Sequence, residues 1–307
     1  MTWVGGADRV GQVPRVIRTV LGDVEPGSVG VVDSHDHLFL TTPVLPGEEL
    51  DDEAAAGAEL RAFSAAGGGT LVQWTPRGLG RGLPALRRLS ASTGVHVVAA
   101  TGRHRRVVYS SGAVVPGLST RELADAFLGD VVERGCGLIK IGIGVDAIAP
   151  DEASALHAAA LAHHATGVPL AIHLEQGSAF GLVLDALRGL GVSERSIVLG
   201  HLGRNPSIDE IVSAAQSGAW LCLDTPSPQQ PNGMDRLALI LETLVDRGHL
   251  PQLLLGADRT AARSRSEPRA SGPVALLETV APRLRDLLGA EAVSRILAAN
   301  PSRAWSF

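Results

Sequence analysis

The chain has 307 residues, of which 45% are hydrophobic and 19% charged, and its formal net charge is −5. This composition excludes disorder, which requires low hydrophobicity and high net charge, and the two cysteines exclude a disulfide-rich scaffold. The acidic balance argues against a nucleic-acid partner, and no apolar run reaches the ~20 residues of a membrane-spanning helix. Because the N-terminus also lacks the apolar core of a secretory signal, we expect a cytoplasmic, globular protein without a membrane partner.

Short apolar segments alternate along the chain with segments of helical periodicity. The expected strands are Val29–Ser34, Thr70–Trp74, Val95–Ala100, Leu138–Ile143, Pro169–His173, Ile197–Gly200, Trp220–Leu223 and Leu253–Gly256. The expected helices are Asp52–Ala65, Leu83–Ser92, Thr120–Arg134, Asp151–Thr166, Ala179–Leu190, Ile208–Ser217, Asp235–Arg247, Val274–Leu288 and Ala290–Ala298. Near-continuous apolar strands are typical of parallel sheets covered on both faces. The pattern predicts a single (β/α)8 TIM barrel domain over residues 1–307, with an N-terminal extension or hairpin over about residues 1–29.

Residues that could bind a metal follow several strands, at the end where such barrels carry their active sites. His35 and His37 project to the same side of the first strand, because strand side chains alternate. Lys140 lies between two isoleucines in the fourth strand, so it points inward if they pack against the helices. Each feature also has an ordinary explanation: a polar loop for the His-x-His pair, and for Lys140 a side chain extending to the rim. The sharper interpretation of Lys140 is a neutral amine that takes up CO2 and becomes an anionic ligand.

Three further strands end in a ligand-type residue, namely His173, His201 and Asp258. Separately, these are explained by buried structural histidines and by an aspartate that caps a helix. Together with the first and fourth strands they form an ordered set, which favours a metal site at the C-terminal face of the barrel. The other six histidines, including His104, lie in helices, junctions or loops and do not fit this pattern.

The ordered set resembles the phosphotriesterase family of the amidohydrolase superfamily, and so do three further segments. These are Leu21-Gly22-Asp23-Val24, Gly137-Leu138-Ile139-Lys140-Ile141-Gly142 and Asn300-Pro301-Ser302-Arg303-Ala304. The resemblance implies two divalent metal ions, zinc first, with cobalt, manganese or iron also suited to mixed N/O ligands. It implies that one metal is held by His35, His37 and Asp258, and the other by His173 and His201.

The same resemblance implies that carboxylated Lys140 and a hydroxide bridge the two metals. The hydroxide would attack an ester, lactone or phosphoester bond, and Asp258 would be the catalytic group that accepts its proton. The resemblance also implies a homodimer.

Three positions depart from the family pattern. Arg204 stands where phosphotriesterases often have a relay aspartate, and residues 101–106 lack the tyrosine usual in the family's lactonases. Thr225 stands where those lactonases have an arginine. These changes weaken both the organophosphate and the acyl-homoserine-lactone assignments, while they leave the metal ligands in place.

Substrate contacts are expected from side chains just beyond the strand ends. Arginines gather there, which predicts a locally basic mouth and a small-molecule substrate that carries a carboxylate or phosphate. These arginines could instead be solvated loop residues. The candidate arginines are Arg77, Arg103, Arg105, Arg204 and Arg259. Phe39, Trp74 and Phe180 are the best-placed aromatic candidates.

Two alternatives to an ester hydrolase stay open. Another amidohydrolase-type enzyme, a deaminase or a nuclease, is disfavoured by Lys140, because those patterns usually lack the bridging lysine. A non-catalytic ligand-binding barrel is disfavoured because all six ligand-type residues are present.

Overall fold

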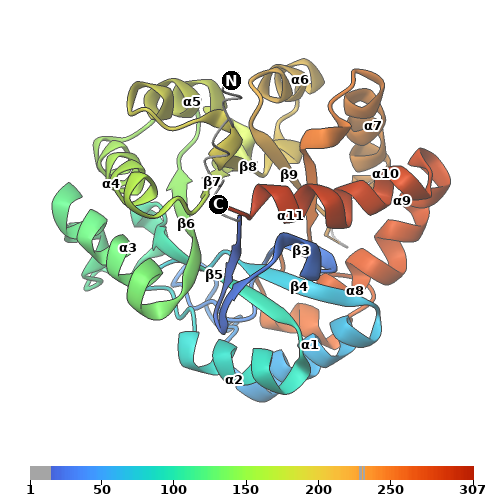
Figure 1. Ribbon diagram of the computed structural model, residues 1–307, viewed down its shortest axis with the longest axis horizontal. Helices are drawn as coiled ribbons and strands as arrows, with labels where there is room; N and C mark the ends of the chain where they lie inside the picture. Colours follow the sequence, from blue (N-terminus) through green and yellow to red (C-terminus); the bar gives the residue numbers. More distant parts are fainter. Residues whose placement is uncertain (1–14, 228–229, 231) are drawn as a thin grey trace, which may run out of the picture.

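The computed structural model describes residues 15–227, 230 and 232–307, and its centre is an eight-stranded parallel sheet. The strands follow one another in sequence order around a ring, with helices on the outside (Figure 1). The strands are β3 (Val31–Asp36), β4 (Gly68–Gln73), β5 (His96–Arg103), β6 (Cys136–Ile143), β7 (Leu170–Leu174), β8 (Ile197–Gly200), β9 (Trp220–Asp224) and β10 (Leu253–Gly256). The helices include α1 (Glu53–Ala65), α2 (Leu83–Thr93), α3 (Thr120–Arg134), α4 (Pro150–Thr166), α5 (Phe180–Gly189), α6 (Ile208–Gln216), α7 (Gly233–Asp246), α8 (Pro273–Ala275), α9 (Ala281–Leu288), α10 (Ala290–Ser294) and α11 (Asn300–Ala304). This arrangement confirms the predicted (β/α)8 barrel.

Side chains alternate along the barrel strands between two apolar cores. On β6, Ile139 and Ile141 belong to the outer core between sheet and helices, whereas Leu138 belongs to the inner core. Lys140 therefore projects into the barrel, since residues two apart on a strand share a face. Its side chain is 2% exposed. Burying this ammonium is costly, so a charged or chemically modified partner is expected nearby.

Carboxylates help to close the ring between β3 and the loop after β10. The backbone N–H of Asp258 donates to the carbonyl of His35 at 2.8 Å. Oδ1 of Asp33 accepts from the backbone N–H of Ala257 at 3.1 Å. Oδ1 of Asp36 accepts from the backbone N–H of Arg259 at 2.8 Å. Both aspartates are buried. The first and last strands are thereby held so that His35 and Asp258 lie side by side.

The N-terminal hairpin and the C-terminal helix cover the end of the barrel at which the strands begin. Strands β1 (Ile17–Thr19) and β2 (Gly22–Val24) form an antiparallel hairpin, and Val16 and Phe307 exchange backbone hydrogen bonds. Trp305 is buried within the inner core, edge-on to Trp74, and α11 crosses the middle of the ring in Figure 1. Strands β1 and β2 lie within the expected N-terminal extension, while residues 1–14 of that extension lie outside the described residues.

The largest difference from the expected elements lies at the C-terminal end. The last expected helix, Ala290–Ala298, continues through a π-helical segment into α11 and ends at Ala304. Pro301 is tolerated because it lies in the first turn of α11, where its missing N–H costs little. Asn300 explains the continuation, since its side-chain amide donates to the carbonyls of Leu250 and Leu253 at the start of β10. Among the described residues, no helix has the length and apolar character needed to cross a membrane.

Candidate active site

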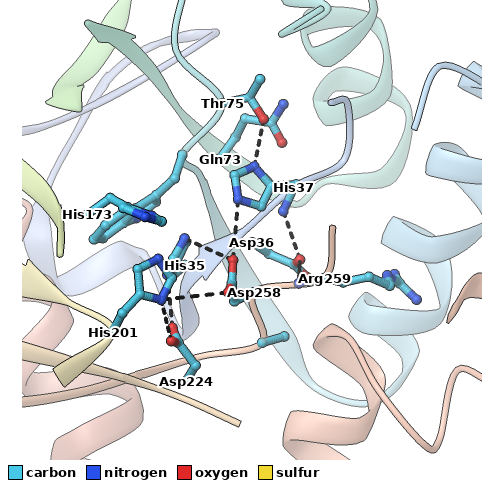
Figure 2. A network of polar contacts seen from close by, with 12 residues as sticks. His35, Asp36, His37, Gln73, Thr75, His173, His201, Asp224, Asp258 and Arg259 are labelled. Carbon is cyan, nitrogen blue, oxygen red and sulfur yellow. Dashed lines mark hydrogen bonds and ion pairs between the residues drawn. The ribbon is translucent and has the colours of Figure 1, made fainter. Parts of the chain in front are cut away.

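Two histidines at the end of β3 converge on one carboxylate oxygen (Figure 2). Nε2 of His35 lies 3.3 Å from Oδ1 of Asp258, and Nε2 of His37 lies 3.4 Å from the same atom. Burial lowers the pKa of His35, so its ring is neutral near pH 7. Burial alone would raise the pKa of Asp258, but His35, His201 and Arg204 outweigh it and hold that pKa well below the ordinary range. Neutral imidazoles and an ionised carboxylate are the forms that bind a metal.

His201 and His173 complete the group from β8 and β7. The ring centroid of His201 lies 5.0 Å from that of His35 and 4.3 Å from that of His173. Ligand atoms of His35, His201 and Asp258 lie within 4.8 Å of one another, which is close enough for one cation to bind all three. His201 and Asp258 both have left-handed backbone conformations, with φ of 66° and 48°. Such strained conformations cost ~1–3 kcal/mol each and cluster at functional sites.

Lys140 is the unusual member of the group. No described residue forms a hydrogen bond or ion pair with its Nζ, although the side chain is buried. Burial lowers its pKa to about 7, against the attraction of Asp258 and Glu175, which raises it. Burial therefore favours the unprotonated, nucleophilic form of this amine.

Asp224 orients two of the histidines, a role that the sequence analysis missed. Its two carboxylate oxygens accept from Nδ1 of His35 at 3.1 Å and from Nδ1 of His201 at 2.5 Å (Figure 2). In the tautomer that donates from Nδ1 to Asp224, Nε2 carries the lone pair that can bind a metal. His37 is fixed in the same way, with its Nδ1 2.7 Å from Oγ1 of Thr75. The sequence feature that could have indicated this role of Asp224 is its position as the charged last residue of the otherwise apolar β9.

The structure corrects the expectation that Trp74 and Phe39 contact substrate. Trp74 is fully buried and stacks beneath His35, with ring centroids 3.9 Å apart and an angle of 25° between the ring planes. Its indole N–H donates to the carbonyl of Ser34 at 2.8 Å. Phe39 is buried against Gly82 in the outer core. Trp74 therefore forms the floor of the site, and Phe39 supports the loop after β3.

The five arginines beyond the strand ends are all paired with carboxylates. The pairs are Arg77–Asp130, Arg103–Asp151, Arg105–Glu175, Arg204–Asp258 and Arg259–Glu59. Arg103 and Arg259 are also buried. Arg204 differs from the rest, because its side chain is 41% exposed and lies 2.5 Å from a carboxylate of the site itself.

A pocket of about 830 Å³ opens beside Asp224 and Asp258, among the loops after β8, β9 and β10. Its wall combines polar side chains with the apolar Leu237 and Ile240. Among the polar lining residues are Arg204, Thr225, Gln230, Arg236, Thr260 and Arg263. Arg259 also lines it. A small molecule in this pocket would reach the carboxylate of Asp258 directly.

His104 also lies in the site, contrary to the expectation that it would not belong to the pattern. It follows β5 and is 9% exposed, and its ring meets that of His173 edge-on with centroids 4.3 Å apart. Burial lowers its pKa well below the ordinary value, and Lys140 and Arg105 lower it further. Little in the sequence indicates that His104 belongs to the site, because it stands among arginines in the loop after β5.

Comparison with known proteins settles the family. The sequence profile of the phosphotriesterase family matches residues 15–305. The chain belongs to this family. It is 29% identical to a phospho-furanose lactonase of Mycoplasmopsis synoviae over 94% of this chain and 91% of that protein. It is also 26% identical to an N-acetyltaurine hydrolase of Danio rerio, over 95% of this chain and 98% of that protein.

Solved structures of this family share the fold. The phosphotriesterase homology protein of Escherichia coli, solved with phosphate in its active site, matches with a TM-score of 0.83 and 27% identity. That match covers 91% of this chain and 99% of the other. A lactonase of Listeria monocytogenes matches with a TM-score of 0.87, over 95% of this chain and 99% of the other, at 23% identity.

Proposed function

We propose that this chain is a metal-dependent hydrolase of ester bonds, lactones foremost, with two divalent cations at the C-terminal face of its barrel. The proposed ligands are His35, His37, Lys140, His173, His201 and Asp258. The observation that carries the proposal is the convergence of His35, His201 and Asp258 within 4.8 Å, beside the buried and unpartnered Lys140. Membership of the phosphotriesterase family supports a binuclear site of this kind.

The donor set fits two cations bridged by a modified lysine. Imidazole nitrogens with carboxylate-type oxygens suit zinc first, and also cobalt, manganese or iron. The amine of Lys140 can attack CO2 and lose one proton, which gives a carbamate whose single negative charge is shared by its two oxygens. Such a group would supply the negative charge that this buried position lacks, and it would give each cation an oxygen ligand.

The protein's own residues prepare the reaction. When bound, the two cations would lower the pKa of a shared water and polarise the oxygen of the scissile group. Asp258 is held ionised, so it can accept the proton that the attacking water loses. Asp224 holds His35 and His201 with Nε2 facing the centre, and Trp74 closes the site from below. Hydrolysis therefore needs no nucleophilic serine or cysteine.

We propose that the substrate is a small lactone or ester with a polar or anionic group near Arg204. This arginine lines the pocket and is exposed, so its outward N–H groups can reach a bound molecule. A relative is named a phospho-furanose lactonase, and the Escherichia coli structure holds phosphate in its active site, which favours an anionic group. Arg259 is the second candidate, since it lines the same pocket although it pairs with Glu59.

The test is hydrolysis after reconstitution with zinc, cobalt or manganese, on a panel of lactones, carboxylic esters and phosphotriesters with anionic and neutral members. We expect metal-dependent turnover of lactones or esters, and a loss of at least 10³-fold in kcat for Asp258→Asn with most of the metal retained. A metal-loaded protein that turns over no ester of any class would contradict the proposal. The single-domain organisation, the cytoplasmic location and the homodimer stay predictions.

A further inference from the structure

His173 differs from two other proposed histidine ligands in the ring nitrogen that a neighbouring carboxylate holds. The rings of His35 and His201 are each held through Nδ1, by the carboxylate of Asp224. The ring of His173 is held through Nε2, which lies 2.9 Å from Oε2 of Glu175. An ionised carboxylate only accepts hydrogen bonds, so in this contact Nε2 of His173 carries the proton. The neutral ring then has its lone pair on Nδ1.

Arg105 binds the same oxygen of Glu175, with Nη2 of the arginine 2.6 Å from Oε2. A guanidinium this close opposes the approach of a metal ion to that oxygen, because like charges repel. Among the described residues, the group of three metal-binding side chains whose ligand atoms lie within 4.8 Å of one another does not include this glutamate. It consists of His35, His201 and Asp258. Glu175 is therefore a partner of the histidine and not a further metal ligand.

The turn after β7 fixes the position of this carboxylate. It spans Glu175–Gly177, and Gln176 within it has a left-handed backbone with φ of 56°. Gly177 packs closely on the turn after β8, where a Cβ would lie 2.8 Å from the carbonyl oxygen of His201. The carbonyl of Gly177 accepts from the side-chain amide of Asn205 at 3.1 Å. The carboxylate is thus presented by a turn that is fastened to the segment of a neighbouring proposed ligand.

We propose that Glu175 and Arg105 are positioning residues, which present Nδ1 of His173 to the cation that this ring shares with His201. The inference rests on the proposed binuclear metal site. Outer partners of this kind orient a ligand histidine and determine which nitrogen binds the metal. Among the described residues, the only proposed ligand that the Glu175 side chain contacts is His173, so it acts on one cation. Asp224 contacts a ligand of each cation.

Competition of a chromophoric chelator with the zinc-loaded protein measures the two metal affinities. We expect Glu175→Leu to weaken one of them ~10–100-fold and to leave the other within ~3-fold. Glu175→Gln keeps one acceptor oxygen, so it should recover part of the loss. Glu291→Leu, at an exposed position on α10, removes the same charge elsewhere and should change neither affinity. Equal weakening of both affinities by Glu175→Leu would overturn the proposal.

Arg105→Met tests whether the arginine acts through the glutamate. Alone, it should weaken the same affinity as Glu175→Leu does, but by less. Combined with Glu175→Leu it should weaken that affinity no further, because residues that act through one another have non-additive effects. Losses that add up in the double variant would overturn the role assigned to Arg105.

The ring nitrogen that binds zinc gives a readout that depends on neither turnover nor overall stability. Long-range proton–nitrogen correlation spectra of zinc-loaded protein with 15N-labelled histidine identify it, and a His173→Asn variant assigns the signals. We expect His173 to carry its proton on Nε2 and zinc on Nδ1, and His35 to show the opposite pattern. Zinc on Nε2 of His173 would overturn the proposal. A folded wild-type protein that binds no metal would refute the proposed function itself, whereas a two-metal protein whose affinities Glu175→Leu leaves unchanged would refute only the role of Glu175.

Discussion

Asp224→Asn tests most sharply how the protein prepares its metal site. The carboxylate of Asp224 accepts from Nδ1 of His35 and of His201, and these histidines belong to different proposed metals. The side chain of asparagine has one oxygen, which can still accept from one of the two histidines. Its N–H₂ group would face the Nδ1–H of the other histidine, so two donors would oppose each other and that ring would lose its hydrogen bond. The variant should therefore weaken metal binding although no ligand is changed.

The expected size follows from the lost hydrogen bond. A hydrogen bond to a charged group contributes about 1.5–3 kcal/mol, and loss of such an orienting partner typically costs ~10–100-fold in metal affinity. His201 has the shorter bond, at 2.5 Å against 3.1 Å, so the metal that it binds should be lost first on titration with a chelator. Competition with a chromophoric chelator measures both affinities, and circular dichroism checks that the fold is kept.

The matched control is Asp209→Asn, at a highly exposed position on α6. Unchanged affinity for both metals in the Asp224→Asn variant would refute the reasoning that this carboxylate sets the histidine tautomers. Equal weakening in the Asp209→Asn control would show that the effect is one of overall charge.

Two other substitutions test the surroundings of the site. Asp130→Asn should cost about 3–5 kcal/mol of unfolding free energy, measured by urea denaturation, because this buried carboxylate binds Arg77, Arg81 and Thr101. Burial alone would raise the pKa of Asp130, but the arginines lower it, so its contribution is complete above the unfolded value of 3.8 and falls as the pH drops below it. The variant should show a shallower loss of stability in acid, and an unchanged acid slope would contradict this. Arg204→Met should raise KM for anionic esters ~10-fold more than for neutral esters, and an equal effect on both would remove Arg204 from substrate recognition.

The barrel and the proposed ligands could be predicted from the sequence because both depend on local regularities. Strand alternation places Lys140 inside the barrel, and the common end of parallel strands brings His35, His173, His201 and Asp258 together. These relations need no knowledge of side-chain packing.

The substrate contacts could not be predicted, because position at a strand end does not determine what a side chain meets. Trp74 is long enough to fold under His35 into the barrel, where Gly200 leaves room for its ring. Arg103 reaches back to Asp151 on α4, a partner distant in sequence. Asp224 was missed for the same reason, since its role depends on hydrogen bonds to His35 and His201, which come from other strands. His104 was missed because its contact with the site is a ring contact with His173, which is distant in sequence.

The central claim is a binuclear metal centre built on Lys140, and metal stoichiometry tests it most directly. Elemental analysis of the purified, zinc-reconstituted protein after extensive dialysis should give about two metal ions per chain, and Lys140→Met should retain less than about one. A well-folded wild-type protein without bound metal, or a Lys140→Met variant that keeps both ions, would contradict the account.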